Sequence, residues 1–235
     1  MQILIDNAGL ITKGLLMTLW LAVLTLILST VVSLILGVLA TLKSRVLRWI
    51  IHGYVEFFRA IPLIVNIFFV YFVLPMMGVN MTPLTAVVFG LTLWGSANGI
   101  EIVRAGIQAV PAHQWRSAWA LGLRPWEMYW YVIGPQAIRS IVPPFTGLLT
   151  LLVQATSLGA LVGVTEFLKA GQIIIEHGAV MQGISPAFFI YGFVLLVYFV
   201  ICSALSWCSR YLEKCMSPGR MNKATKVSNF MRESI

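Results

Sequence analysis

The sequence predicts an all-α integral membrane protein, with five transmembrane helices and one short helix outside the membrane. Two observations predict this class. Hydrophobic residues make up 59% of the 235 residues and charged residues only 10%, whereas a soluble domain carries roughly 25% charged residues. Long apolar stretches also alternate with shorter polar segments along the chain. A water-soluble fold of this composition would expose far too much apolar surface.

The first span is expected over about residues 14–42, a run without charge between Lys13 and Lys43. It exceeds the roughly 20 residues that cross a bilayer. It also exceeds the apolar region of about 7–15 residues in a signal peptide. Ser29, Ser33 and Gly37 recur at every fourth position, which favours close packing against another transmembrane helix.

The second span is expected over about residues 50–74. Glu56 and Arg59 stand at i and i+3, so they can pair on one face near the membrane edge. Pro62 lacks an N–H and therefore frees a backbone carbonyl, which a neighbouring helix or a water-filled cavity must satisfy. We take Arg59, Pro62 and Asn66 as candidate residues of a substrate pathway or gate, with an interface ion pair as the alternative role for Arg59.

The third span, about residues 84–103, leads into Glu101 and Arg104, again at i and i+3. Charges cost less at the membrane edge than at its centre, so these two form either a structural salt bridge or part of the gate. The fourth span, about residues 141–164, carries Gln154, Thr156 and Ser157. These side chains indicate either a water-filled pathway or hydrogen bonding between helices.

The fifth span is expected over about residues 187–207. The polar segment before it, residues 166–185, is expected to lie outside the membrane. Residues 1–215 would then form one transmembrane domain. The basic tail, residues 216–235, has little apolar content and is expected to be disordered.

The segment between spans three and four, residues 105–140, is too polar to cross a bilayer. Pro111 and Pro125 bracket a stretch that could form about three helical turns. Four of its residues fall at i, i+3, i+4 and i+7 and give it an apolar face: Trp115, Ala118, Trp119 and Gly122. Such a helix either joins two spans along the membrane surface, with its aromatic residues as an interfacial belt, or serves as a handle for another protein.

The run QWRSAWALGLRPWEMYWYVIGPQ, which begins at Gln114, resembles the EAA loop of binding-protein-dependent ABC importer permeases of the polar amino acid branch. That loop follows approximately the pattern E-A-A-x-x-x-G and ends in I-x-L-P. The matching positions are Arg116-Ser117-Ala118, Gly122 and Ile133-Gly134-Pro135. Arg116 replaces the acidic residue of the family and Gly134 replaces its leucine. The reversed charge at Arg116 predicts an acidic partner, or a second permease that supplies the usual glutamate.

Three further runs resemble signatures of the same family. EFFRAIPLIVN is similar to a segment that contains FRGTPLLVQ, with Asn66 where glutamine is usual. EIVRAGI, which begins at Glu101, is similar to E-I-x-R-A-G-I. Gln154-Ala155-Thr156-Ser157-Leu158 stands where the family has K-D-[ST]-S-L, so direct recognition of substrate by charge is not expected there. The resemblance covers about residues 14–212.

The resemblance implies a permease subunit that passes a polar amino acid across the membrane by alternating access. The FRAIPL variant and the fifth span favour a glutamate/aspartate-type member. Separate ATPase subunits would bind ATP and Mg²⁺ and dock on Gln114, Trp115, Arg116, Ser117, Ala118, Trp119, Ala120, Leu121, Gly122 and Leu123. The other implied partners are a second permease, the same or homologous, and a periplasmic solute-binding protein.

Several function classes are excluded or disfavoured by the residues present. The chain has no phosphate-binding glycine loop with a following lysine, so it is not expected to hydrolyse ATP. The three histidines fall outside the span centres and the three cysteines lack metal-site spacing. We therefore expect no catalytic residue, no metal site and no cofactor bound by this chain. A self-sufficient secondary transporter or channel remains the alternative, although such transporters usually carry ionisable residues near the midplane.

The positive charges predict the orientation. With five spans, thirteen Lys and Arg residues fall in loops or tail on one side of the membrane, and only Lys13 and Lys169 on the other. The positive-inside rule puts the Gln114–Leu123 helix and the C-terminus in the cytoplasm and the N-terminus outside. This accounts for the net charge of +8 without nucleic acid. We expect a bacterial inner membrane protein surrounded by membrane lipid.

Overall fold

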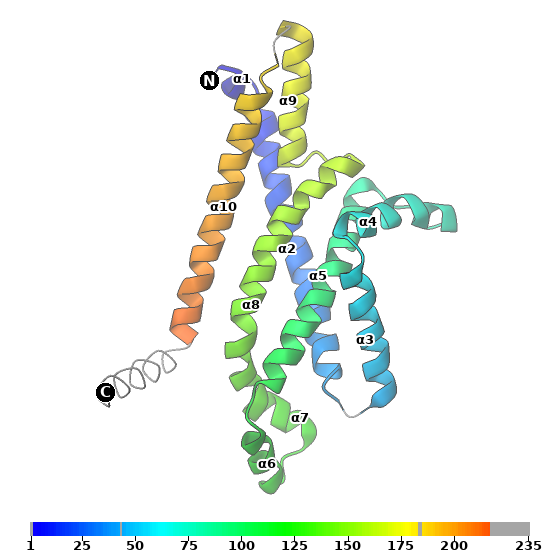
Figure 1. The fold of residues 1–235 in the computed structure, drawn as a ribbon, viewed down its shortest axis with the longest axis vertical. Coiled ribbons are helices and arrows are strands. Elements are labelled where there is room, and N and C mark those ends of the chain that lie inside the picture. Colours follow the sequence, from blue (N-terminus) through cyan, green and yellow to red (C-terminus); the bar gives the residue numbers. More distant parts are fainter. Residues whose placement is uncertain (1, 43, 183–184, 217–235) are drawn as a thin grey trace, which may run out of the picture.

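The computed structural model of the chain describes residues 2–42, 44–182 and 185–216, and its regular elements there are all helical (Figure 1). The α-helices are α1 (Gln2–Asp6), α2 (Ala8–Leu39), α3 (Arg45–Ala60), α4 (Leu63–Phe68), α5 (Pro83–Gln108), α6 (Ala112–Ala120), α7 (Pro125–Glu127), α8 (Gly134–Ala155), α9 (Phe167–Gln182) and α10 (Ala187–Met216). Shorter π and 3₁₀ turns connect some of them: η1 (Phe69–Val73), η2 (Leu74–Met77), η3 (Met128–Ile133) and η4 (Thr156–Val162).

Four helical segments of the described chain are long and apolar enough to cross a membrane: Ala8–Leu39, Pro83–Gln108, Pro125–Val162 and Ala187–Lys214. A fifth span results if α3 and the segment Leu63–Met77 are taken together, although the two are bent by 104° where they meet. The prediction of an all-helical membrane protein is confirmed. The second of the five expected spans is broken rather than continuous.

Helix ends differ from the expected span ends because a helix does not stop where the bilayer does. α2 begins at Ala8, before the uncharged run starts, and α10 continues to Met216. Residues 208–216 contain good helix formers and neither glycine nor proline, so nothing interrupts the helix there. The part of the expected disordered tail from residue 217 onward lies outside the described residues.

The predicted small-residue stripe on α2 packs against α5. Ser29, Ser33 and Gly37 are all buried. The hydroxyl of Ser33 donates to the backbone carbonyl of Ser96, at 3.2 Å. A Cβ atom on Gly99 of α5 would lie 2.8 Å from the Cβ of Ser33, so only glycine allows the two backbones to approach this closely. Small residues on both helices thus hold the centre of the molecule together.

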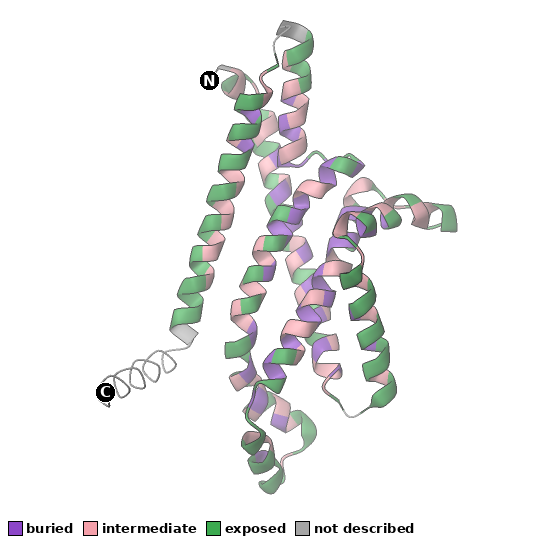
Figure 2. Cartoon of the chain, viewed as in Figure 1, coloured by how far each residue is buried: buried purple, intermediate pink, exposed green. Residues whose placement is uncertain are grey.

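The main apolar core lies where α2, α4, α5 and α8 meet. Its fully buried members are Leu21, Ile67, Val87, Leu91 and Leu152. Figure 2 shows the buried positions concentrated on the central helices, whereas α10 and α3 are largely exposed along their outer sides. Exposed apolar side chains on a membrane helix contact lipid or another subunit, so these faces are not defects of the fold.

The segment expected to be polar and outside, residues 166–185, contains a helix that the sequence analysis does not predict. It forms α9, which packs against α2 and α10 at the end of the molecule that also holds α1 (Figure 1). Phe167, Ala170 and Ile174 are buried there. Their spacing places them on one helical face. The polar residues between them make this apolar face hard to recognise in the sequence.

Candidate functional site

α6 is the short helix expected between the third and fourth spans, and it lies at the opposite end of the molecule from α9 (Figure 1). It begins directly after Pro111 and ends before Gly122, which adopts a φ of +73°. The N–H of Gly122 donates to the carbonyl of Trp119 at 3.0 Å, and that of Leu123 to the carbonyl of Ala118 at 3.2 Å. This is a Schellman termination, which requires a residue in the left-handed conformation, most often glycine. α6 spans Ala112–Ala120, so it begins and ends slightly earlier than the expected helix Gln114–Leu123.

The apolar face of α6 is divided between the chain's own interior and its surface. Trp115 packs edge-on against Tyr129, with ring centroids 5.4 Å apart, and Ala118 is buried. Trp119 is 57% exposed and Leu121 is 79% exposed. Trp119 is thus the more exposed of the two tryptophans expected to bind a partner, whereas Trp115 is half-buried in a contact within its own chain.

Tyr129 connects α6 to the membrane spans. Its ring contacts Trp115, and its hydroxyl lies 2.9 Å from the hydroxyl of Thr41 just beyond α2. The side-chain amide of Gln136 on α8 also donates to the side-chain oxygen of Gln114, at 3.3 Å. The sequence gives no signal for Tyr129 beyond its place in a run of aromatic residues, because Thr41 is distant in the chain. These contacts join α6 to the residues that follow α2 and to α8.

A cavity of about 1090 Å³ separates α6 and η3 from the nearby ends of α2, α3 and α5. We call it the α6 cavity. Its walls combine tryptophan and tyrosine rings with arginine side chains. The polar and aromatic residues that line it are Thr41, Arg45, Arg48, Trp49, His52, Glu101, Arg104, Gln108, Trp115, Trp119 and Tyr129.

The predicted pair of Glu101 and Arg104 forms inside this cavity. Arg104 donates through Nε at 3.1 Å and through Nη2 at 2.5 Å to the two carboxylate oxygens of Glu101. Both side chains are partly exposed, so the pair contributes little to stability, typically about 0–1 kcal/mol. The structure therefore brings two of the gate candidates together with the two tryptophans of α6.

The pairing considered for Glu56 and Arg59 is not formed. Both side chains are exposed on α3, and no salt bridge joins them within the described part of the chain. An exposed pair gains little over hydration of the separate ions, so spacing at i and i+3 does not by itself hold it together. Arg59 also lies outside the α6 cavity.

Pro62 separates α3 from α4, and Asn66 compensates for the break. Ile61 is extended, as favoured before proline, with φ −83° and ψ 131°. The side chain of Asn66 is almost fully buried and donates to the carbonyl of Phe58, at 3.4 Å. The carbonyl freed by Pro62 is thus satisfied by the next helix, one of the two alternatives that the sequence left open. The side chain of Asn66 is therefore directed at the carbonyl of Phe58 and is buried.

The polar residues of the fourth span point in different directions. Gln154 and Ser157 line a groove of about 670 Å³ between α8 and α10, together with Tyr198 and Ser206. Thr156 is fully buried instead, and its hydroxyl donates to the carbonyl of Val153, at 2.7 Å. The reason is local, since α8 ends at Ala155 and the tighter helix η4 begins at Thr156. Of these three residues, Gln154 and Ser157 line the groove and Thr156 does not.

Glu166 is a buried carboxylate that the pattern of the sequence does not reveal. It accepts hydrogen bonds from the N–H groups of Leu168 at 2.9 Å and Lys169 at 2.8 Å, which caps the start of α9. Tyr198 of α10 donates to it at 3.0 Å, and the hydroxyl of Thr18 on α2 lies at 3.4 Å. Burial raises the pKa of Glu166, while these hydrogen bonds act in the opposite direction. The network ties three helices together between the fourth and fifth spans.

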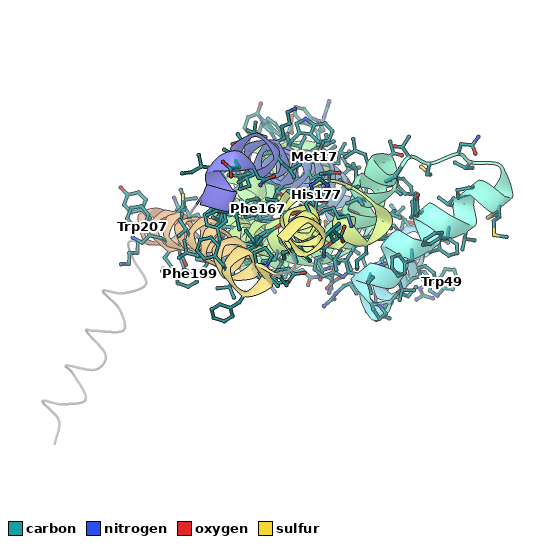
Figure 3. The ribbon with its side chains drawn as sticks, turned by 90° about the horizontal axis from the view of Figure 1, so that it is seen from above. Met17, Trp49, Phe167, His177, Phe199 and Trp207 are labelled. Atoms are coloured by element: carbon teal, nitrogen blue, oxygen red, sulfur yellow. The ribbon has the colours of Figure 1, made fainter. Side chains whose placement is uncertain are left out.

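Figure 3, seen from the α9 end, shows Phe167 within the packed bundle and Trp49 at the outer edge of the arm formed by α3 and α4. Trp207 and Phe199 lie on α10, on the other side of the molecule. Trp49 lines the α6 cavity and Phe199 lines the α8–α10 groove, and both side chains are exposed, so lipid or further subunits would contact them there.

Comparison with known proteins matches residues 29–217 to the family described as "Binding-protein-dependent transport system inner membrane component". The chain is 32% identical over 213 residues to the probable amino-acid ABC transporter permease protein YckA of Bacillus subtilis, covering 91% of this chain and 92% of that protein. It is 32% identical over 209 residues to the glutamine transport system permease protein GlnP of Escherichia coli, covering 88% and 93%. The crystal structure of an amino acid ABC transporter with histidines superposes with a TM-score of 0.80 at 26% identity, covering 90% and 96%.

Proposed function

The chain belongs to the family of binding-protein-dependent transport system inner membrane components and is an amino-acid ABC transporter permease, and from this premise we propose that it passes a polar amino acid inward by alternating access. As a permease subunit it is not an enzyme, since ATP hydrolysis resides on partner ATPase subunits, and it works beside a partner permease in the bacterial inner membrane. The transport cycle would depend on α6, on the break between α3 and α4, and on the α8–α10 groove.

The proposed docking site for the ATPase is the exposed side of α6 and its C-terminal turn. One observation carries this assignment. α6 presents Trp119 and Leu121 to its surroundings, while Trp115 and Tyr129 fix the same helix to α2. A partner that binds the exposed side can therefore move the spans. Bound ATP and Mg²⁺ would belong to that partner.

The proposed orientation follows the distribution of positive charge. Lys and Arg are concentrated in the loops and tail on the α6 side of the chain, with only Lys13 and Lys169 on the other. The positive-inside rule then favours a cytoplasmic α6 and an N-terminus outside. A periplasmic solute-binding protein would approach the end formed by α1 and α9.

Alternating access needs parts of the spans to move relative to one another. The break between α3 and α4 could act as one hinge, since the chain bends by 104° there, between α3 and the segment Leu63–Met77. The pair of Glu101 and Arg104 lies where the α6 cavity meets α5, and it costs little to open. We propose that this pair serves in the gate, and that Gln154 and Ser157 line the solute's route.

The proposed substrate class is a polar amino acid, with glutamate and aspartate the first candidates to test. GlnP of Escherichia coli is named for glutamine, which supports a polar side chain. The α8–α10 groove offers hydroxyl and amide groups from Thr150, Gln154 and Ser157. Such groups can hydrogen-bond a polar solute without requiring one sign of charge.

Uptake into proteoliposomes tests this proposal. The full-length chain is reconstituted with its ATPase, its partner permease and its solute-binding protein, and labelled amino acids are supplied with the binding protein outside. The proposal expects accumulation that requires both internal ATP and the binding protein. Uptake by this chain alone, driven by an ion gradient, would instead identify a secondary transporter.

A further inference from the structure

We propose that the α8–α10 groove holds the α-ammonium group of the transported amino acid through the hydroxyl oxygens of Ser157 and Tyr198. This assignment rests on the proposed function, since it takes a polar amino acid as the solute, and it names the group of that solute which this chain recognises.

The hydroxyl groups on the α8 side of the groove can accept hydrogen bonds from a solute but not donate them. Ser157 and Thr150 both line the groove. The hydroxyl of Ser157 donates to the backbone carbonyl of Gln154, at 2.7 Å. The hydroxyl of Thr150 donates to the carbonyl of Thr146, at 3.3 Å. Because a hydroxyl has a single hydrogen and two lone pairs, each of these oxygens offers a solute only its lone pairs.

Tyr198 presents the same kind of oxygen from the α10 side. It lines the groove, and its hydroxyl donates to Glu166 at 3.0 Å. Glu166 is fully buried, and its carboxylate is fixed by the N–H groups of Leu168 and Lys169, at 2.9 and 2.8 Å. The hydrogen of Tyr198 is therefore bonded to a group outside the groove, and a solute can meet only the lone pairs of its oxygen.

The oxygens of Ser157 and Tyr198 lie at one end of the groove. The side chain of Tyr198 interacts with that of Thr156, the residue directly before Ser157. Gln154 lines the groove on the preceding turn, and its amide oxygen is a further acceptor. An ammonium group has three N–H donors and no acceptor, so it can bond several of these oxygens at once. Hydrogen bonds from a charged donor are also stronger than those between neutral groups.

A carboxylate is poorly matched to this end of the groove. Among the described residues that line the groove, Arg210 is the only lysine or arginine. It lies about 18 Å along α10 from Tyr198, at the rise of about 1.5 Å per residue of an α-helix. An amino acid is much shorter than this distance. A carboxylate has only acceptor oxygens, so beside Ser157 and Tyr198 it would face lone pairs, whereas an ammonium group would face acceptors.

Binding is measured on the complex of the full-length chain with its partner permease and ATPase in nanodiscs, without ATP or solute-binding protein. Radiolabelled glutamate or glutamine, whichever binds more tightly, is displaced by two analogues. One lacks the α-ammonium group (glutarate or glutaramate), and the other lacks the α-carboxylate (4-aminobutanoate or 4-aminobutanamide). We expect loss of the ammonium group to weaken binding about thirtyfold, and loss of the carboxylate to weaken it less than about threefold.

Variants of this chain assign the effect to its own oxygens. Y198F and S157A each remove one acceptor and should weaken binding of the amino acid about tenfold, while binding of the analogue without an ammonium group stays unchanged. Y191F on α10 and S140A on α8 are the matched controls, since both positions are exposed and outside the groove, and they should match the wild type. S157A leaves the bond to Glu166 intact, so it decides the test if Y198F does not fold.

Three results would overturn the assignment. The first is equal binding of the amino acid and the analogue without an ammonium group. The second is a loss of affinity in S157A that is the same for both of these probes, or that S140A shares. The third is that none of the probes binds. The expected binding without ATP-driven uptake would leave the ammonium site standing and reject the proposed function. ATP-driven uptake with any of the three contrary results would reject only the ammonium site.

Discussion

The side-chain amide of Asn66 donates to the backbone carbonyl of Phe58, with 3.4 Å between Nδ2 and the oxygen. In an unbroken helix this carbonyl would accept from the N–H four residues later. That position is Pro62, which has no N–H. A residue of α4 therefore supplies the donor that α3 lacks, at the point where the chain bends by 104° between α3 and the segment Leu63–Met77.

Replacing Asn66 with alanine should destabilise the protein by about 1–3 kcal/mol, because a buried carbonyl is left without a donor. The matched control is N98A. The Asn98 amide donates to the carbonyl of Trp94, at 2.9 Å, which lies inside the unbroken helix α5. Fluorescence-detected size-exclusion chromatography after heating should show a lower melting temperature for N66A than for N98A. Equal melting temperatures would mean that the Asn66 bond does not support the break.

The two tryptophans of α6 should respond differently to substitution. W119A removes an exposed side chain, so it should leave the thermal stability nearly unchanged while reducing co-purification with the ATPase. W115A removes the ring that packs on Tyr129 and should cost about 1–3 kcal/mol of stability, as expected for a partly buried aromatic side chain. Pull-down of the ATPase from detergent extracts, together with melting curves, separates the two effects. Undiminished ATPase binding by W119A would show that the exposed side of α6 is not the docking surface.

Glycine at position 122 should be needed because of its left-handed backbone conformation, not because a side chain would lack room there. Within this chain, a Cβ atom at Gly122 would meet no atom within 4 Å, but the residue has a φ of +73°. G122A should therefore destabilise the α6 termination by about 1–2 kcal/mol, and G122N should cost less, since asparagine tolerates this conformation. Gly147 also has open space around its Cβ position but no positive φ, so G147A serves as the control. If G122A and G147A melt alike, the Schellman turn is not a constraint on α6.

Stability should depend on pH through Glu166. Burial raises the pKa of Glu166 above its ordinary value of 4.5, so folding favours the protonated carboxyl. The stability that it contributes is full below the unfolded value and is lost as pH rises through the higher folded value. E166Q cannot ionise, so its melting temperature minus that of the wild type should increase as pH rises from about 4.5.

The hydroxyl of Tyr198 donates one of the hydrogen bonds that lower the pKa of Glu166. Without it, in Y198F, the pKa of Glu166 should rise further, so the melting temperature of Y198F should fall more with rising pH than that of the wild type. Melting temperatures between pH 4 and 8, measured in parallel for wild type, E166Q and Y198F, check both statements. A constant difference between E166Q and wild type across this range would contradict the raised pKa.

Much of the fold follows from patterns that are local in the chain. Uncharged runs longer than a bilayer crossing identify α2 and α10, and a stripe of small residues such as Ser33 identifies the face of α2 that packs on α5. The i, i+3 spacing of Glu101 and Arg104 correctly indicates their pair. These features depend on residues within a few turns of each other, so the sequence contains the information directly.

The features that the sequence does not reveal depend on partners that are distant in the chain. Thr41 is bonded to Tyr129, and Thr18 and Tyr198 meet at Glu166. No periodicity links such positions. The same spacing also gives opposite outcomes, since Glu101 and Arg104 pair whereas Glu56 and Arg59 do not. Which outcome occurs is decided by the surrounding helices, and these are not visible in a local pattern.

The most direct test of α6 as the ATPase docking site is to measure on which side of the membrane α6 lies. Cysteine is introduced at Leu121, which is 79% exposed beside α6, or at Val180, which is 83% exposed on α9, after Cys202, Cys208 and Cys215 are replaced by serine. A membrane-impermeant maleimide is then added to intact cells and to inside-out vesicles. We predict that L121C reacts only in inside-out vesicles and V180C only in intact cells. Labelling of L121C in intact cells would place α6 away from ATP and contradict the central claim.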